Sequence, residues 1–266
     1  MVTAVAFGFG VMRCQPLRRA LGLIEANLFM AQERIAKSLG VELIHLGLQM
    51  GTSKKEWKST LSHKFVSVEN AVLDHYISNG WQGYAGEGGL LLNLIKAMSF
   101  PILSPRHKST FVEALYAKNV AFEEDKFDSS WLISNVQKAT PTQVSANFAV
   151  MSSGNPVELD LGSFKSTQQS TVLDFFPNLS DSLLLGLHLH LGNTKLAEIA
   201  KIFAQDPYAY RKGWADVTIW KDGHVKFLEV KAPGDRIQSN QKVIIEKFVK
   251  PLSLDFAIVD VFNIKT

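Results

Sequence analysis

A predicted β-hairpin constrains the fold of this chain more than any other feature of its sequence. Two β-rich runs within residues 217–230 flank the dipeptide Asp222-Gly223, which is typical of a two-residue hairpin turn. With these residues in the turn, Asp216 lies directly opposite Glu229, and their Cβ atoms are about 4.5–5.5 Å apart. Lys231 shares the face of Glu229, because side chains alternate along a strand. The hairpin therefore brings two acids and an amine together.

This set of charged groups needs a chemical explanation. Two opposed carboxylates repel each other, and a divalent cation such as Mg²⁺ removes that penalty by binding their oxygens. Water bound to the cation is easier to deprotonate, and an adjacent ammonium stabilises charge that develops on a phosphate. Asp216, Glu229 and Lys231 therefore suit metal-assisted hydrolysis. The alternative is a surface hairpin on which three charged residues fall by chance.

The same residues carry a family resemblance. Asp216, followed across the hairpin by Glu229-Val230-Lys231, resembles the core motif of the PD-(D/E)xK nucleases. The longer stretch 213–241 resembles the VRR-Nuc branch of that superfamily, found in Fanconi-associated nucleases, although Ala215 stands where a proline is usual.

The resemblance implies a Mg²⁺- or Mn²⁺-dependent DNA nuclease. In it, Asp216 and Glu229 hold the metal, the Val230 carbonyl is a further ligand, and Lys231 positions or activates the attacking water. Gln241 lies on the apolar face of a helix predicted over residues 237–250. The resemblance implies that it helps to place the catalytic lysine or the substrate.

A glutamate far upstream is a further candidate ligand. On a helix that starts near Glu87, this residue forms one stripe with Leu91, Leu94 and Met98, so we expect its carboxylate to face inward. A buried carboxylate needs a partner, which is either a metal ion or the N-terminal dipole of the helix. The segment 68–88 resembles the part of Fanconi-associated nucleases that supplies a catalytic glutamate. The resemblance therefore implies that Glu87 is a third acidic metal ligand.

Several side chains around the hairpin are candidate DNA contacts. Cations interleaved with aromatic rings suit a nucleic-acid strand, through phosphate contacts and base stacking. The candidates are Tyr210, Arg211, Lys212, Arg236 and Lys242. For Tyr210, Arg211 and Lys212, the alternative is a loop without a DNA-binding role, which tyrosine side chains anchor.

We predict an α/β fold with a PD-(D/E)xK restriction-endonuclease-like core, in which helices flank a mixed central sheet. The apolar run 256–262 is predicted as a buried strand that closes this sheet. Residues 1–62 are predicted as a helical N-terminal segment and linker. Residues 63–266 are predicted as the VRR-Nuc nuclease domain, with helices and loops inserted between about residues 101 and 193.

Composition limits the partners and the compartment. The chain has 266 residues, 46% of them hydrophobic, and a net charge of +3, which is compatible with a polyanionic partner. No apolar run approaches the ~20 residues of a membrane span, so we expect no membrane partner. The single cysteine, Cys14, fits a reducing compartment. We therefore expect a cytoplasmic, nucleoid-associated protein in a bacterium or a nuclear one in a eukaryote.

Three functions compete at this level. The first is a structure-specific endonuclease or exonuclease that acts on flapped, branched or nicked DNA in repair. The second is a dimeric nuclease of the Holliday-junction resolvase type, since stand-alone VRR-Nuc domains resemble resolvases. The third is a non-catalytic DNA-binding module. A monomer and a homodimer both stay open, as do partners among repair proteins.

Overall fold

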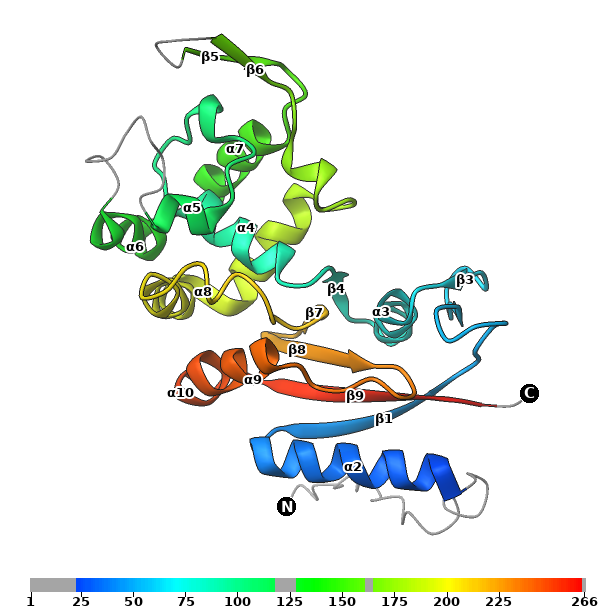
Figure 1. The fold of residues 1–266 in the computed structure, drawn as a ribbon. Helices are drawn as coiled ribbons and strands as arrows, with labels where there is room; N and C mark the ends of the chain where they lie inside the picture. Colours follow the sequence, from blue (N-terminus) through cyan, green and yellow to red (C-terminus); the bar gives the residue numbers. More distant parts are fainter. Residues whose placement is uncertain (1–22, 118–127, 161–164, 265–266) are drawn as a thin grey trace, which may run out of the picture.

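A five-stranded mixed sheet forms the centre of the molecule (Figure 1). The computed structural model describes residues 23–117, 128–160 and 165–264. The strands of the central sheet are β1 (Glu42–Leu48), β4 (Gln82–Ala85), β7 (Val217–Lys221), β8 (His224–Lys231) and β9 (Phe256–Asn263). Their spatial order is β1-β9-β8-β7-β4. Strands β1, β9 and β8 run parallel, whereas β7 is antiparallel to both of its neighbours. The predicted mixed sheet is confirmed.

The hairpin β7–β8 forms in the predicted register. Val217 pairs with Leu228 and Lys221 pairs with His224, so Asp222 and Gly223 are the turn residues. Their φ angles are 50° and 83°, and positive values at both positions are typical of the type I′ turn that matches the twist of a hairpin.

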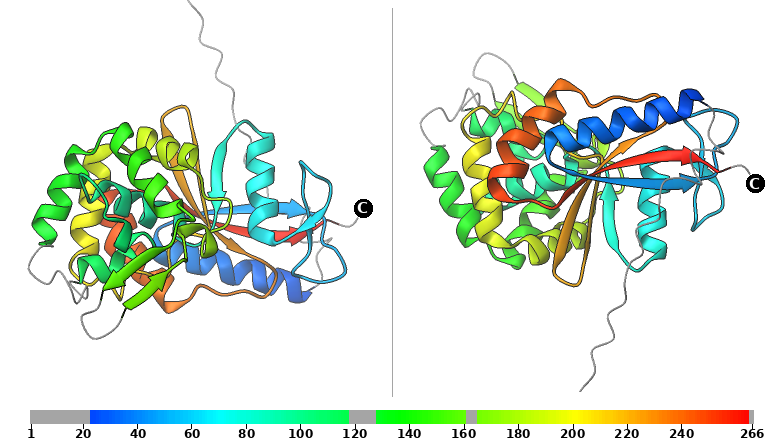
Figure 2. Two further views of the ribbon diagram at one scale, coloured as in Figure 1. Left: turned by 90° about the horizontal axis from the view of Figure 1, so that it is seen from above. Right: turned by 90° about the horizontal axis from the view of Figure 1, so that it is seen from below.

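Helices cover both faces of the sheet (Figure 2). Helix α3 (Val68–Ser78) packs on the face that carries Leu228 and Val230. The other face is covered by α2 (Leu23–Leu39), α8 (Asp181–Phe203) and the successive helical segments α9 (Ser239–Ile244), η3 (Ile245–Val249) and α10 (Lys250–Leu252). Because side chains alternate along β8, Glu229 and Lys231 face the α9 side of the sheet.

A helical lobe adjoins the sheet beside β4. It contains α4 (Gly89–Met98), η1 (Pro105–His107), α5 (Val112–Tyr116), α6 (Ser129–Lys138), α7 (Pro141–Ser152), the hairpin β5 (Val157–Asp160)–β6 (Lys165–Gln168), η2 (Val172–Asp174) and part of α8. Every residue of α4 is buried, because this helix packs against α5, α6, α7 and α8. The predicted insertion of helices and loops corresponds to most of this lobe.

The N-terminal part of the chain differs from the prediction. Helix α2 matches the expected helical periodicity, but residues 42–48 form strand β1, which pairs with β9. Within the predicted linker, β2 (Trp57–Lys58) pairs with β3 (Phe65–Val66), and Trp57 is completely buried. Part of the predicted N-terminal segment thus belongs to the central sheet. Strand β9 does not close that sheet, because β1 covers its outer edge.

Cys14 lies outside the described residues. In the ranges that the structure describes, no helix has both the length and the apolar character needed to cross a bilayer.

Replacing Gly223 by alanine tests the turn. A Cβ there would have no heavy atom within 4 Å, but φ is +83°. The expected cost is therefore backbone strain alone, about 1–2 kcal/mol of unfolding free energy. Gly154→Ala is a matched control, because its Cβ also meets nothing within 4 Å and its φ is not positive. Urea unfolding of both variants measures the difference, and equal effects would contradict the assigned turn.

Candidate active site

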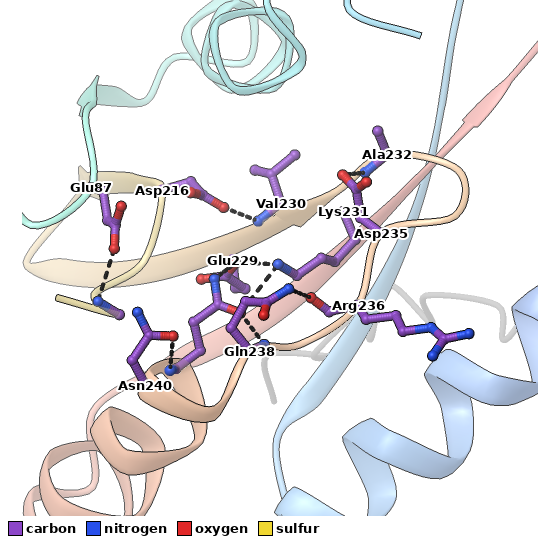
Figure 3. Close-up of polar contacts among 12 residues, drawn as sticks. Glu87, Asp216, Glu229, Val230, Lys231, Ala232, Asp235, Arg236, Gln238 and Asn240 are labelled. Atoms are coloured by element: carbon purple, nitrogen blue, oxygen red, sulfur yellow. Dashed lines mark hydrogen bonds and ion pairs between the residues drawn. The ribbon is translucent and has the colours of Figure 1, made fainter.

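Glu229 is the buried centre of the candidate site (Figure 3). Its Oε1 atom accepts hydrogen bonds from Lys231 Nζ at 2.7 Å and from Gln241 Nε2 at 2.6 Å. Its Oε2 atom is buried and no donor group of the described residues reaches it, while the Asp216 carboxylate lies within hydrogen-bond reach of Glu229. Buried carboxylate oxygens are normally satisfied, so Oε2 fits a cation as its partner.

Asp216 holds the second carboxylate of the site, directly before β7. Its Oδ2 atom accepts a hydrogen bond from the Val230 N–H at 2.8 Å, and its main-chain oxygen accepts one from the Gly86 N–H at 2.8 Å. The backbone of β8 and that of the turn after β4 therefore fix Asp216 beside Glu229.

Asp216 makes the ionisation of Glu229 more costly. Burial first, and then the negative charge of Asp216, raise the pKa of Glu229 to about 9, although Lys231 opposes the shift. Burial also raises the pKa of Asp216, although the Val230 N–H, a hydrogen bond with Glu229 and the charge of Lys231 oppose this shift. Near neutral pH the protein alone therefore keeps a proton on Glu229. Mg²⁺ and Mn²⁺ fit this pair, because hard cations prefer carboxylate oxygens.

Gln241 connects the lysine to the buried acid. It lies in the first turn of α9, where its Oε1 atom accepts hydrogen bonds from the Gln238 N–H at 2.7 Å and from Lys231 Nζ at 3.3 Å. Its amide nitrogen donates to Glu229. The structure thus brings Asp216, Glu229, Lys231 and Gln241 together, in contacts that agree with the role the resemblance implies for Gln241.

Gly213 is a structural member of the site for which the sequence analysis predicted no role. Its φ is +89°, and a Cβ there would lie 2.5 Å from the main-chain carbon of Asn240. Its N–H donates to Glu87 Oε1 at 2.8 Å. Only glycine permits this close approach of the loop to the start of α9. Its place directly before the Trp-Ala-Asp run was the only sequence signal.

Glu87 does not face inward as predicted. Helix α4 begins at Gly89, and Gly88 precedes it with φ 67°. Glu87 is therefore in an exposed turn, off the stripe of apolar residues, and no side chain caps the helix. The inward-facing prediction is wrong because Gly88 redirects the chain before the helix starts.

The structure does not bring all three acids into one cluster. Within the described ranges, no group of three His, Cys, Asp or Glu side chains is arranged to hold a metal ion. Glu87 lies at the edge of the site through its bond to Gly213. Its role as a ligand stays a prediction, as does that of the Val230 carbonyl.

The candidate DNA contacts divide into two groups. Tyr210 is buried, and its ring packs edge-on against that of Phe248 at 5.1 Å between centroids. The predicted base stacking by Tyr210 is therefore wrong, and its ring anchors the loop, as in the alternative. The other candidates are exposed: Arg211, Lys212, Arg236 and Lys242. Their contacts with DNA stay predictions, and Figure 3 shows Arg236 pointing away from the buried acids.

The residues of this site coincide with a known domain. Residues 165–263 match the family model of the VRR-NUC domain, and this range includes Asp216, Glu229, Lys231 and Gln241. Over this range the chain is similar to VRR-NUC domains. Glu87 and the first half of the helical lobe lie outside the matched range.

Similarity extends beyond the VRR-NUC domain. The chain is 22% identical over 200 residues to a Fanconi-associated nuclease 1 homolog of Schizosaccharomyces pombe, in a match that covers 74% of this chain and 27% of the relative. A crystal structure of paFAN1 bound to 5′-flap DNA with a 2-nucleotide flap and a gap superimposes with a TM-score of 0.59, at 15% identity, over 95% of this chain and 45% of that one.

A second paFAN1 structure, with a 1-nucleotide flap, gives a TM-score of 0.53 at 17% identity, over 88% of this chain and 42% of that one. The predicted fold class and the VRR-NUC resemblance are confirmed. The chain spans only about a quarter of the curated relative and less than half of paFAN1.

The raised pKa of Glu229 predicts a pH-dependent effect of Glu229→Gln on the metal-free protein. The unfolded side chain ionises near its ordinary pKa of 4.5, whereas the folded one keeps its proton up to about pH 9. Wild-type stability therefore falls as pH rises through this window. Glutamine does not titrate, so in EDTA the variant should gain melting temperature relative to wild type between about pH 5 and about pH 8. A pH-independent difference in thermal melts would contradict the assigned burial.

Proposed function

We propose that this protein is a metal-dependent DNA nuclease that hydrolyses phosphodiester bonds in flapped, branched or nicked DNA. The observation that carries the proposal is the buried Glu229 carboxylate, with Lys231 and Gln241 on one oxygen and no donor group of the described residues on the other. The similarity to nucleases named for Fanconi-associated nuclease 1, one of them bound to flap DNA, supports the choice of substrate.

Asp216 and Glu229 are the proposed holders of Mg²⁺ or Mn²⁺. Both carboxylates lie on one side of the hairpin, and the Val230 N–H fixes the orientation of Asp216. Glu87 and the Val230 carbonyl are the further ligands that the resemblance implies. A divalent cation bound there lowers the pKa of its water and neutralises charge on the scissile phosphate.

Lys231 supplies the amine of the proposed mechanism. Its Nζ atom is held by Glu229 and Gln241, so its position is defined before substrate arrives. An ammonium can donate three hydrogen bonds, and these two contacts leave one for the attacking water or for the phosphate. Gln241 acts as a positioning residue, since it binds both partners at once.

Asp216→Ala and Lys231→Ala should each lower cleavage by at least about 100-fold, because each removes a group that acts on the reacting phosphate. DNA binding should be largely retained. The measurement is digestion of end-labelled flaps, junctions and nicked duplexes with Mn²⁺, next to an anisotropy titration in EDTA. Lys201→Ala, an exposed lysine of α8, is the charge-matched control. Equal cleavage by the wild type and both site variants would refute the proposal.

Metal binding has a readout that does not need cleavage. Mn²⁺ should raise the melting temperature of the wild type, since a ligand of the folded state stabilises it by about 2.7 kcal/mol at 100 times its Kd. Glu229→Gln and Asp216→Ala should lose most of this rise, and Glu246→Gln, an exposed glutamate of η3, should keep it. The same rise in all four proteins would place the metal elsewhere.

A further inference from the structure

Three polar side chains form a row across the face of the sheet that carries the candidate active site. His45 of β1 pairs in register with Asp260 of β9, and Asp260 pairs in register with Lys231 of β8. The three strands run parallel, so side chains at paired positions point to the same face, on strands about 4.8 Å apart. The row therefore extends from Lys231 toward the outer edge of the sheet at β1.

Asp260 is a charged residue in an otherwise apolar strand. Phe256 and Ile258 precede it on the same face of β9, and both are buried core residues. A carboxylate in such a place is costly unless polar partners compensate for it. His45 supplies one partner, because its Nδ1 atom lies 3.2 Å from Asp260 Oδ2, in a pair whose side chains are only 24% and 15% exposed. On the other side of Asp260, the next side chain of the row is Lys231.

The position of Asp260 suits a counter-charge for the Lys231 ammonium. Strands β7 and β9 flank β8, so Asp216, directly before β7, and Asp260 lie on opposite sides of Lys231. A divalent cation at Asp216 and Glu229 would repel the ammonium, and a carboxylate on its far side offsets that repulsion. Helix α2 packs against β1 and β9 (Figure 1), and charges that are partly buried in this way are screened little by salt.

We infer that Asp260 is a positioning residue for the proposed nuclease reaction. Its carboxylate holds the Lys231 ammonium in place when a cation occupies the neighbouring acids, and His45 orients that carboxylate. The inference rests on the proposed function and adds two residues to the proposed site. Neither residue touches the phosphate, since both act through Lys231.

A double-mutant cycle in EDTA tests the interaction without cleavage. Asp260→Asn keeps the shape of the side chain and removes its charge. It should lower the urea midpoint of the wild type by more than it lowers that of Lys231→Met, because the ammonium that the carboxylate stabilises is absent from the second protein. Equal changes in both backgrounds would overturn the inference.

Single-turnover cleavage of a flap duplex with saturating Mn²⁺ tests the role in the reaction. Asp260→Asn should lower the rate about tenfold, as expected when a residue that orients a reacting group is lost, and Asp260→Glu should restore most of it by restoring the charge. The Kd for DNA in EDTA and the rise in melting temperature with Mn²⁺ should stay as in the wild type. An unchanged rate, or a loss that appears in the Kd instead, would overturn the positioning role.

Asp255→Asn is the matched control. Asp255 directly precedes β9 and is exposed, and its carboxylate lies 3.4 Å from Lys226 Nζ, away from the row. This variant should cleave as the wild type does, and a tenfold loss here would show that the rate reports only the charge of the strand. Failure of the wild type to cleave with Mn²⁺ would instead overturn the nuclease function, whereas the cycle in EDTA would still report the interaction of Asp260 with Lys231.

Discussion

A carboxylate buried in the face of an apolar sheet is costly unless its surroundings compensate for it, and much of this molecule is arranged around the one at Glu229. Strand β8 supplies the lysine two residues further on, and α9 supplies the glutamine that bonds both groups. The segment before β7 supplies Asp216, whose charge raises the cost again. This combination of compensation and repulsion is the physical basis of the proposed divalent-cation site.

The second constraint is the meeting of three chain segments at Gly213. Its N–H binds Glu87 from the β4–α4 turn, and its Cα lies against the backbone at the start of α9. A side chain at this position would separate the loop from α9 and so disturb Gln241. The positions of the buried site and of Glu87 are therefore linked through Gly213, which has no side chain to take part in the proposed reaction.

The central sheet and the helical lobe have different roles in the proposed nuclease. The sheet and α9 hold the reacting groups, whereas the lobe packs on the sheet through α8 and presents aromatic rings near the site.

The sequence by itself determined the hairpin, its register and the partners that face each other across it, because a two-residue turn and the alternation of side chains act over a few residues. It also indicated α3, the helical character of α2 and Gln241 on an apolar face, which depend on local periodicity. Only the tertiary structure decided that residues 42–48 form a strand, since their partner β9 lies about 200 residues away. Tyr210 and Glu87 were misjudged for a related reason. The burial of the Tyr210 ring depends on its packing against Phe248, in a distant segment. The direction of the Glu87 carboxylate depends on the backbone angle at Gly88, which no local pattern specifies.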